Sequence, residues 1–208
     1  MEQGDSELLL RWRAGDLTAG EALFERYYAM VERFFINKVD TGVGDLVQET
    51  FIACVESRDR LKKTSRFRSY LFAVAHNILF RHLRTRYRRG ETFDAEAVSV
   101  RDLSPGPSSV AVRRTEQRLL LEALRSISVA HQVVLELHYW ENMTTAEIAE
   151  VLDTPVGTVR SRLQRARSHL EAAMDSLERS PEVLESTKSH LDDWAQQCRQ
   201  AFIAQSAR

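Results

Sequence analysis

Closely spaced basic and amide side chains in the last third of the chain are of the kinds that bind nucleic acid. On one side of a helix expected over 155–174 lie Thr158, Arg160, Ser161, Gln164 and Arg165. Arg can pair with two acceptors on guanine, Gln pairs with adenine, and Ser can bind base edges or phosphate. The spacing therefore predicts a face that contacts DNA. The alternative is an ordinary solvated, Arg-rich helix face.

Two short helices joined by a tight turn would position these side chains. Thr144 and Glu147 have the spacing of a capping box, which starts the first helix over 144–152. The buried stripe of the second helix is expected to consist of Val159, Leu163, Ala166 and Leu170. Asp153 lies at the turn, and Asp tolerates the left-handed conformation better than most residues. This pattern is typical of a helix-turn-helix, whose second helix enters the major groove.

A second cluster of basic residues lies earlier in the chain. Residues 58–90 hold 11 basic and 1 acidic side chains, a charge of +10, in a protein whose net charge is −1. Cations mixed with aromatic rings suit single-stranded nucleic acid, because they neutralise phosphates and offer surfaces to unstacked bases. So many like charges in one domain also repel unless an anion relieves them. The cluster predicts a second anion-binding surface.

An acidic helix expected over 45–57 precedes that cluster. Its outward face would carry Asp45, Gln48, Glu49 and Ile52, and its inward face Val47, Phe51, Cys54 and Val55. An exposed acidic face that includes one apolar residue could dock a basic protein partner. A solvated face without a partner is the alternative.

The apolar periodicity is helical nearly throughout, which predicts an all-α fold of two small helical domains. Expected helices span 5–14, 17–38, 45–57, 67–89, 113–126, 130–140, 144–152, 155–174 and 183–204. The segment 91–112 loses the periodicity and includes two prolines in a Ser-rich run, so we expect a flexible tether there. The expected organisation is a first domain over 1–90, the linker over 91–112, a second domain over 113–175 and a C-terminal helical extension over 176–208.

The sequence contains no pattern typical of catalysis. Its six histidines and two cysteines lack metal-ligand spacing, and no phosphate loop or nucleophile elbow is present. We therefore expect no enzyme, no catalytic residue, no cofactor and no metal. Cys54 and Cys198 lie far apart, which indicates a reducing cytoplasm. No apolar run is long enough to span a bilayer, so membrane insertion is not expected.

Three motifs, in this order, resemble one family. They are DLVQETF at 45–51, FRSYLFAVAHN at 67–77 and EIAEVLDTPVGTVRSRLQRAR at 147–167. Together they resemble the bacterial sigma-70 superfamily of RNA polymerase sigma factors, in its two-domain extracytoplasmic-function (ECF) group. The resemblance implies a factor that directs core polymerase to promoters and initiates transcription. The alternative is a stand-alone helix-turn-helix regulator that binds duplex operator DNA, which would need neither the basic cluster at 58–90 nor the acidic helix.

The resemblance also implies roles for individual residues. In such factors the first domain docks on the clamp helices of the largest polymerase subunit, through positions that match Asp45, Gln48, Glu49 and Ile52. The same domain melts the promoter and binds the minus-ten element, through positions that match Arg66, Phe67, Arg68, Asn77, Arg81 and Arg84. The second domain docks the polymerase flap and reads the minus-thirty-five element, through the positions of the helix face described above.

The extension over 176–208 goes beyond the minimal architecture of that family. Its apolar stripe comprises Leu191, Trp194, Cys198 and Phe202. A lone surface helix would not expose Trp and Phe without a partner. We expect the extension to pack on the protein's own domains or to form an interface that regulates activity, and a merely stabilising helix is the alternative. The implied partners are thus core polymerase, promoter DNA, and either an anti-sigma factor or this extension.

Overall fold

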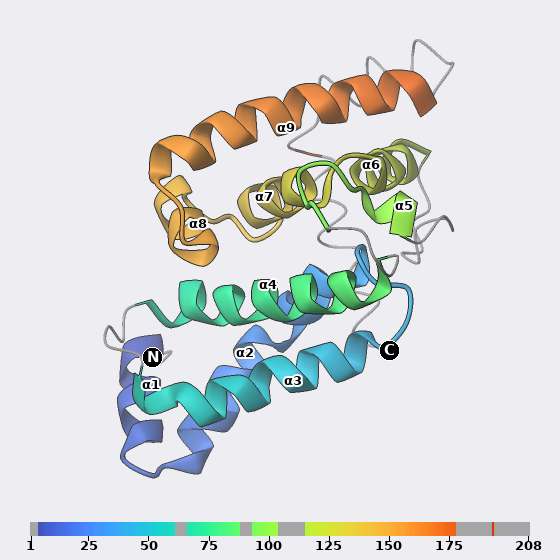
Figure 1. Cartoon of the computed structure of the whole chain (residues 1–208). Coiled ribbons are helices and arrows are strands. Elements are labelled where there is room, and N and C mark those ends of the chain that lie inside the picture. The colour runs from blue at the N-terminus through green and yellow to red at the C-terminus, as the bar shows by residue number, and fades with distance from the viewer. Residues whose placement is uncertain (1–3, 61–65, 88–92, 104–114, 178–192, 194–208) are drawn as a thin grey trace.

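The computed structural model describes residues 4–60, 66–87, 93–103, 115–177 and 193, and every named element within them is a helix. Figure 1 shows the helices in two stacked groups. The first group consists of α1 (Asp5–Arg13), α2 (Leu17–Ile36), α3 (Val43–Ser57), η1 (Arg58–Arg60) and α4 (Phe67–Arg86). The second consists of α5 (Val100–Leu103), α6 (Thr115–Ser126), α7 (Val129–Tyr139), α8 (Thr145–Leu152) and α9 (Val156–Leu177). The all-α prediction is confirmed for these residues, whereas the helix expected over 183–204 lies outside them apart from residue 193.

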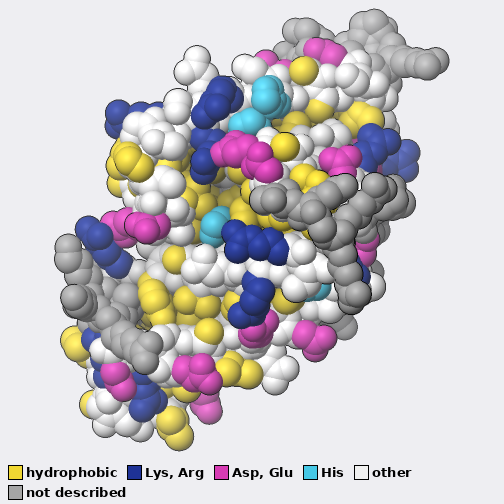
Figure 2. Space-filling model, in the orientation of Figure 1, with side chains coloured by type: hydrophobic (Ala, Val, Ile, Leu, Met, Phe, Trp, Pro, Cys, Tyr) yellow, Lys and Arg dark blue, Asp and Glu magenta, His cyan; other side chains and the backbone are white. Residues whose placement is uncertain are grey.

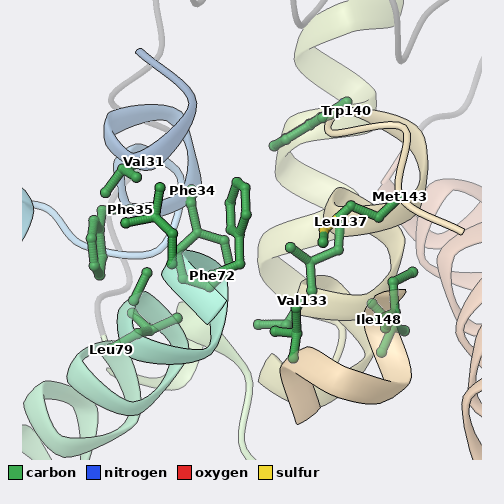
Figure 3. Packing of buried hydrophobic residues seen from close by; sticks show 14 of the residues in the cluster. Val31, Phe34, Phe35, Phe72, Leu79, Val133, Leu137, Trp140, Met143 and Ile148 are labelled. Atoms are coloured by element: carbon green, nitrogen blue, oxygen red, sulfur yellow. The ribbon is translucent and has the colours of Figure 1, made fainter. Parts of the chain in front are cut away.

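The first group packs around the long helix α2. Asp16 starts α2 by accepting hydrogen bonds from the backbone N–H groups of Thr18 and Ala19, as an N-cap residue does. Phe34 near the end of α2 meets Phe35 and Phe72 edge to face, with ring centroids 5.4 and 5.7 Å apart (Figure 3). These rings are buried, so they hold α4 against α2.

The second group contains the helix-turn-helix. The capping box of α8 is present, because Thr144 accepts from the Glu147 N–H while the Glu147 carboxylate accepts from the Thr144 N–H. Asp153 ends α8 in the left-handed conformation, with φ 48° and ψ 48°. Val159, Ala166 and Leu170 of α9 are buried, and Leu163 is partly buried against the core. The predicted supersecondary structure is therefore confirmed.

The expected tether over 91–112 differs from the structure in its first half. Phe93 packs on Phe80 and Tyr87 at the end of α4, and the residues that follow it, α5 among them, fold against the second group of helices. Backbone bonds run from the Val129 N–H to the Val98 carbonyl and from the Ala130 N–H to the Ala95 carbonyl. Val98 and Val100 are buried there. Two isolated valines give no helical periodicity in the sequence, yet they are enough to anchor this segment. Residues 104–114, which hold both prolines, lie outside the described residues.

The two groups of helices pack against each other. Helix α4 lies along α8, and the end of α2 approaches α7. Figure 3 shows the apolar side chains on the two sides of this contact, with Phe34 and Phe72 on one side and Val133 and Leu137 on the other. We call these groups the first domain and the second domain below.

Candidate nucleic-acid and polymerase interfaces

The predicted DNA-contacting face of α9 is open to solvent. Its exposed side chains are Arg160, Ser161, Gln164 and Arg165, and Thr158 is partly buried beside them. The Ser161 hydroxyl donates to the Thr158 carbonyl at 3.0 Å, and the Arg165 Nε lies 3.4 Å from the Ser161 carbonyl. Gln164 and Arg165 are exposed, so the face presents hydrogen-bond donors to whatever binds there.

The other two arginines of α9 have partners within the protein. Arg162 is largely buried and forms an ion pair with Glu96 at 2.6 Å. Arg167 lies over the Tyr139 ring, 5.5 Å from its centroid. The four arginines thus divide into an outward pair, Arg160 and Arg165, and a pair held by neighbouring segments.

Three residues expected at the melted strand have partners within the protein instead, two of them in the second domain and one in the first. Arg66 is exposed but pairs with Glu150 of α8 at 2.5 Å. Phe67 is only 1% exposed and packs edge to face on Tyr27, with centroids 5.6 Å apart. The Arg68 guanidinium donates to the backbone carbonyl of Glu141. Arg66 and Arg68 are not free to meet DNA while the two domains are packed together, and Phe67 is buried against a helix of its own domain.

The remaining three residues of that predicted set lie on the exposed side of α4. Asn77, Arg81 and Arg84 are all open to solvent. Arg81 forms an ion pair with Glu49 of α3, so the predicted strand-binding and polymerase-docking residues adjoin on the surface. The structure therefore places two of the six expected strand contacts at the domain contact, one inside the first domain and three on this open face.

The outer face of α3 combines charge with apolar surface. Asp45, Gln48 and Glu49 are exposed, and Ile52 is 49% exposed. Val55, expected to face the core, is 42% exposed, and Tyr28 of α2 is 47% exposed and stacks on Phe51. Sequence reasoning missed Val55 because it lies at the boundary of the buried stripe. It missed Tyr28 because nothing in the chain pattern places α2 beside α3. The face is thus more apolar than expected.

The surface charges are mixed. Figure 2 shows Lys and Arg side chains next to Asp and Glu on the visible face. Part of the +10 cluster is thus relieved by this protein's own acids, among them Glu49 and Glu150. Within the described residues, no cluster of three His, Cys, Asp or Glu side chains could hold a metal ion. No helix described here is both long and apolar enough to cross a membrane.

Comparison with known families agrees with this division into two domains. Residues 23–89 match the family model for sigma-70 region 2, and residues 117–170 match that for sigma-70 region 4. The ECF RNA polymerase sigma-E factors of Escherichia coli K12 and Salmonella typhimurium LT2 are each 30% identical over 182 residues. That alignment covers 83% of this chain and 95% of each relative. The sigma-E factor of Haemophilus influenzae is 28% identical over the same length.

Solved structures give the same fold. CnrH, in complex with the cytosolic domain of CnrY, superimposes with a TM-score of 0.59 at 26% identity, covering 84% of this chain and 99% of CnrH. The sigma factor RpoE of Bartonella quintana, in complex with the anti-sigma factor NepR, gives 0.58 at 19% identity, covering 74% of this chain and 96% of RpoE. Because the curated relatives align across both domains, the helix-turn-helix does not act as a stand-alone regulator. The chain belongs to the ECF group of the sigma-70 family, and it is a non-enzymatic RNA polymerase sigma factor that initiates transcription.

Proposed function

We propose that the first domain docks core polymerase through the outer face of α3 and binds the minus-ten element, and that the second domain reads the minus-thirty-five element through α9. The observation that carries this assignment is the pair of open faces on different domains. One is apolar and acidic, which suits a protein partner whose interface core excludes water. The other presents Arg and Gln donors on a helix that can enter a major groove.

In this proposal, Asp45, Gln48, Glu49 and Ile52 contact the polymerase, and Tyr28 and Val55 extend the apolar part of that contact. Asn77, Arg81 and Arg84 contact the melted strand and its phosphates. Arg66 and Arg68 join them once the second domain has moved away, whereas Phe67 joins them only when its packing on Tyr27 within the first domain opens. Thr158, Arg160, Ser161, Gln164 and Arg165 contact the upstream element.

The proposed partners include an anti-sigma factor. RpoE and CnrH, which share this fold, were each solved with a second protein, which is an anti-sigma factor in the case of RpoE. By this likeness, an anti-sigma factor is a proposed partner of this chain. The extension over 176–208 is the alternative inhibitor. Because core polymerase and the chromosome are the other partners, the proposed location is the cytoplasm.

In vitro transcription tests the proposal directly. Purified protein and core polymerase should together yield transcripts from defined start sites on genomic templates, whereas neither component alone should. Promoter mapping should recover two separated elements. Start sites that do not depend on this protein would contradict the proposal.

Glu49→Lys tests the docking face. Reversing an exposed charge within a protein contact mainly weakens the binding of the partner, because like charges then repel each other across the contact. Core binding should weaken about tenfold. Arg81→Ala removes the same ion pair from its other end and should leave core binding unchanged. Glu21→Lys, on an exposed site of α2, controls for the change in net charge. Equal core binding by Glu49→Lys and wild type would refute the role of this face.

A further inference from the structure

Glu96, in the folded half of the linker, holds one arginine of the helix proposed to read DNA. Its carboxylate pairs with Arg162 of α9 at 2.6 Å, and its other oxygen lies 3.8 Å from Nε2 of His131 of α7. The exposed fractions of the Arg162 and Glu96 side chains are 19% and 42%. Salt screens a partly buried pair less than an exposed one, so this pair is more persistent than a surface ion pair.

The turn that carries Glu96 is fixed to the second domain through its backbone. The Ala130 N–H at the start of α7 donates to the Ala95 carbonyl at 3.0 Å. The Asp94 carboxylate accepts from the Glu96 N–H at 2.9 Å, which holds the turn in shape. Glu96 and Arg162 therefore belong to one domain, and their pair involves no residue of the first domain.

Two histidines join α7 to α9 beside this pair. The Nδ1 atoms of His131 and His169 lie 3.1 Å apart, and their rings meet edge to face with centroids 4.7 Å apart. His131 is only 3% exposed. Since these rings and the buried stripe of α9 hold the helix in place, loss of the Glu96 side chain should release the Arg162 guanidinium without displacing the helix.

Arg162 lies at the edge of the DNA-contacting face of α9. Residues four before and three after a helical position are its surface neighbours, and for Arg162 these are Thr158 and Arg165 of that face. Within the part of the chain that the structure describes, the buried Nε of Arg162 has no hydrogen-bond partner. The hold on the guanidinium thus depends on the Glu96 carboxylate. Carboxylates and phosphates both accept charge-assisted hydrogen bonds from Arg, so Glu96 takes the part that a DNA phosphate could take.

We propose that Glu96 acts as an internal substitute for a DNA phosphate, which keeps Arg162 out of contact with the DNA backbone and thereby limits the affinity of the second domain for any duplex. The inference rests on the proposed function, because that function assigns DNA binding to this face of α9. Each phosphate that a protein neutralises releases counterions and strengthens binding to every sequence alike. With one cation fewer at the DNA, the domain binds weakly by itself, and its promoter binding depends more strongly on core polymerase.

Glu96→Ala removes the partner of Arg162 and tests the proposal directly. Holoenzyme formed from core polymerase and the full-length chain is titrated onto two duplexes, a promoter fragment recovered by start-site mapping and the same fragment with its upstream element scrambled. The variant should bind both duplexes about fivefold more tightly at about 0.1 M salt. The slope of log K against log salt should steepen by about 0.9, as expected for one additional phosphate contact. The ratio of the two affinities should stay unchanged.

Two further variants show whether Arg162 carries the gain. Glu96→Ala combined with Arg162→Ala has the net charge of the wild type and should return both the affinity and the slope to wild-type values. Glu171→Ala removes an equal charge from an exposed site of α9 and should leave the slope unchanged. If circular dichroism shows that Glu96→Ala is unfolded, Glu96→Gln replaces it, and its slope should steepen by a smaller amount.

An unchanged slope in the folded Glu96 variant would overturn the proposal, because Arg162 would then gain no phosphate. A gain that persists in the double variant would also overturn it, since loss of a negative charge alone would then explain the tighter binding. Weaker binding to the promoter fragment alone would show that Glu96 orients α9, and this too would overturn it. Equal binding of both duplexes by wild-type holoenzyme would instead contradict the proposed function, whereas the slope on scrambled DNA would still test Glu96.

Discussion

Arg162 and Arg165 lie three residues apart on α9 but differ in what holds them. Arg165 is exposed, whereas Arg162 is paired with Glu96 and largely buried. A base-contacting Arg makes a bidentate pair with guanine. Arg165→Ala should therefore weaken binding to the upstream element by about 1–3 kcal/mol. Titration of promoter DNA with the polymerase holoenzyme measures this loss.

Arg162→Ala is the matched control for that substitution. It removes the same charge from the same helix, but its guanidinium already has a carboxylate partner. Its effect on promoter binding should be clearly smaller than that of Arg165→Ala. If Arg165→Ala weakens binding to scrambled DNA by the same amount, Arg165 touches only phosphate and does not read a base.

Asp153 carries the strain of the turn between α8 and α9. Its φ of 48° lies in the left-handed region, which costs an L-residue about 1–2 kcal/mol and costs glycine nothing. Asp153→Gly relieves this strain but also raises the conformational entropy of the unfolded chain, which opposes folding. The free energy of unfolding should therefore rise by only about 0.5 kcal/mol. Urea denaturation measures it. Asp153→Ala should destabilise instead, and a stabilising Ala would show that the turn is not strained.

At the scale of elements, the crossing of α1 and α2 depends on one glycine. A Cβ at Gly20 would lie 2.6 Å from Nε1 of Trp12, whose ring is buried between the two helices. Gly20→Ala should lower the free energy of unfolding by about 1–3 kcal/mol, because overpacking outweighs the better helix propensity of Ala. Thermal and urea denaturation measure this loss.

Gly44 supplies the matched control for Gly20. It is also helical, in α3, but a Cβ there would meet no atom within 4 Å. Gly44→Ala should raise stability by up to about 1 kcal/mol, since only the propensity term remains. Opposite signs at the two glycines would establish the close crossing, and equal signs would contradict it.

The elements themselves were predictable because most helices repeat apolar residues at intervals of three and four. Expected and observed bounds of α2 and α8 differ by two residues or fewer at each end. The folded half of the linker was not predictable, because the burial of Val98 and Val100 depends on contacts with segments that are distant in the chain. The capping box of α8 was predictable, since its two partners are three residues apart.

The domain contact could not be predicted from the sequence for a different reason. Arg33 and Lys38 pair with Glu141 and Glu136 across this contact. All four look like surface charges in the chain, because charged residues are rarely buried unless paired. Their partners are about 100 residues away, so no local pattern joins them. The same holds for Phe67, whose motif suggested an exposed ring and whose burial depends on Tyr27 of another helix.

At the scale of the whole molecule, the basic cluster at 58–90 interacts electrostatically with acidic groups of the second domain. The sequence suggested that an external anion must relieve the +10 charge. With the two domains packed together, Glu150 and the Glu141 carbonyl relieve part of this charge from the second domain. Promoter DNA would therefore compete with these two groups for Arg66 and Arg68, so DNA binding by these arginines is coupled to separation of the domains.

His76 is a titratable group in the region between the domains, and its protonation links stability to pH. It lies on α4, and its ring centroid is 4.2 Å from that of Phe80. Burial, together with the charges of Arg162, Arg84 and Lys38, lowers its pKa from 6.5 to about 4 despite a hydrogen bond with Asn77 that opposes the shift. Between these two values the unfolded chain binds a proton that the folded protein does not.

Stability should consequently fall as the pH decreases. The contribution of His76 is fully present above pH 6.5 and is lost as the pH falls toward 4, amounting to about 2 kcal/mol between pH 7 and pH 5. Urea denaturation at the two pH values measures the drop in the wild type and in His76→Gln. The variant should lose about 2 kcal/mol less than the wild type, and the remaining drop belongs to other groups, including His82 and His131, whose pKa values burial also lowers. A variant that keeps the full drop of the wild type would show that His76 is not held neutral between the domains.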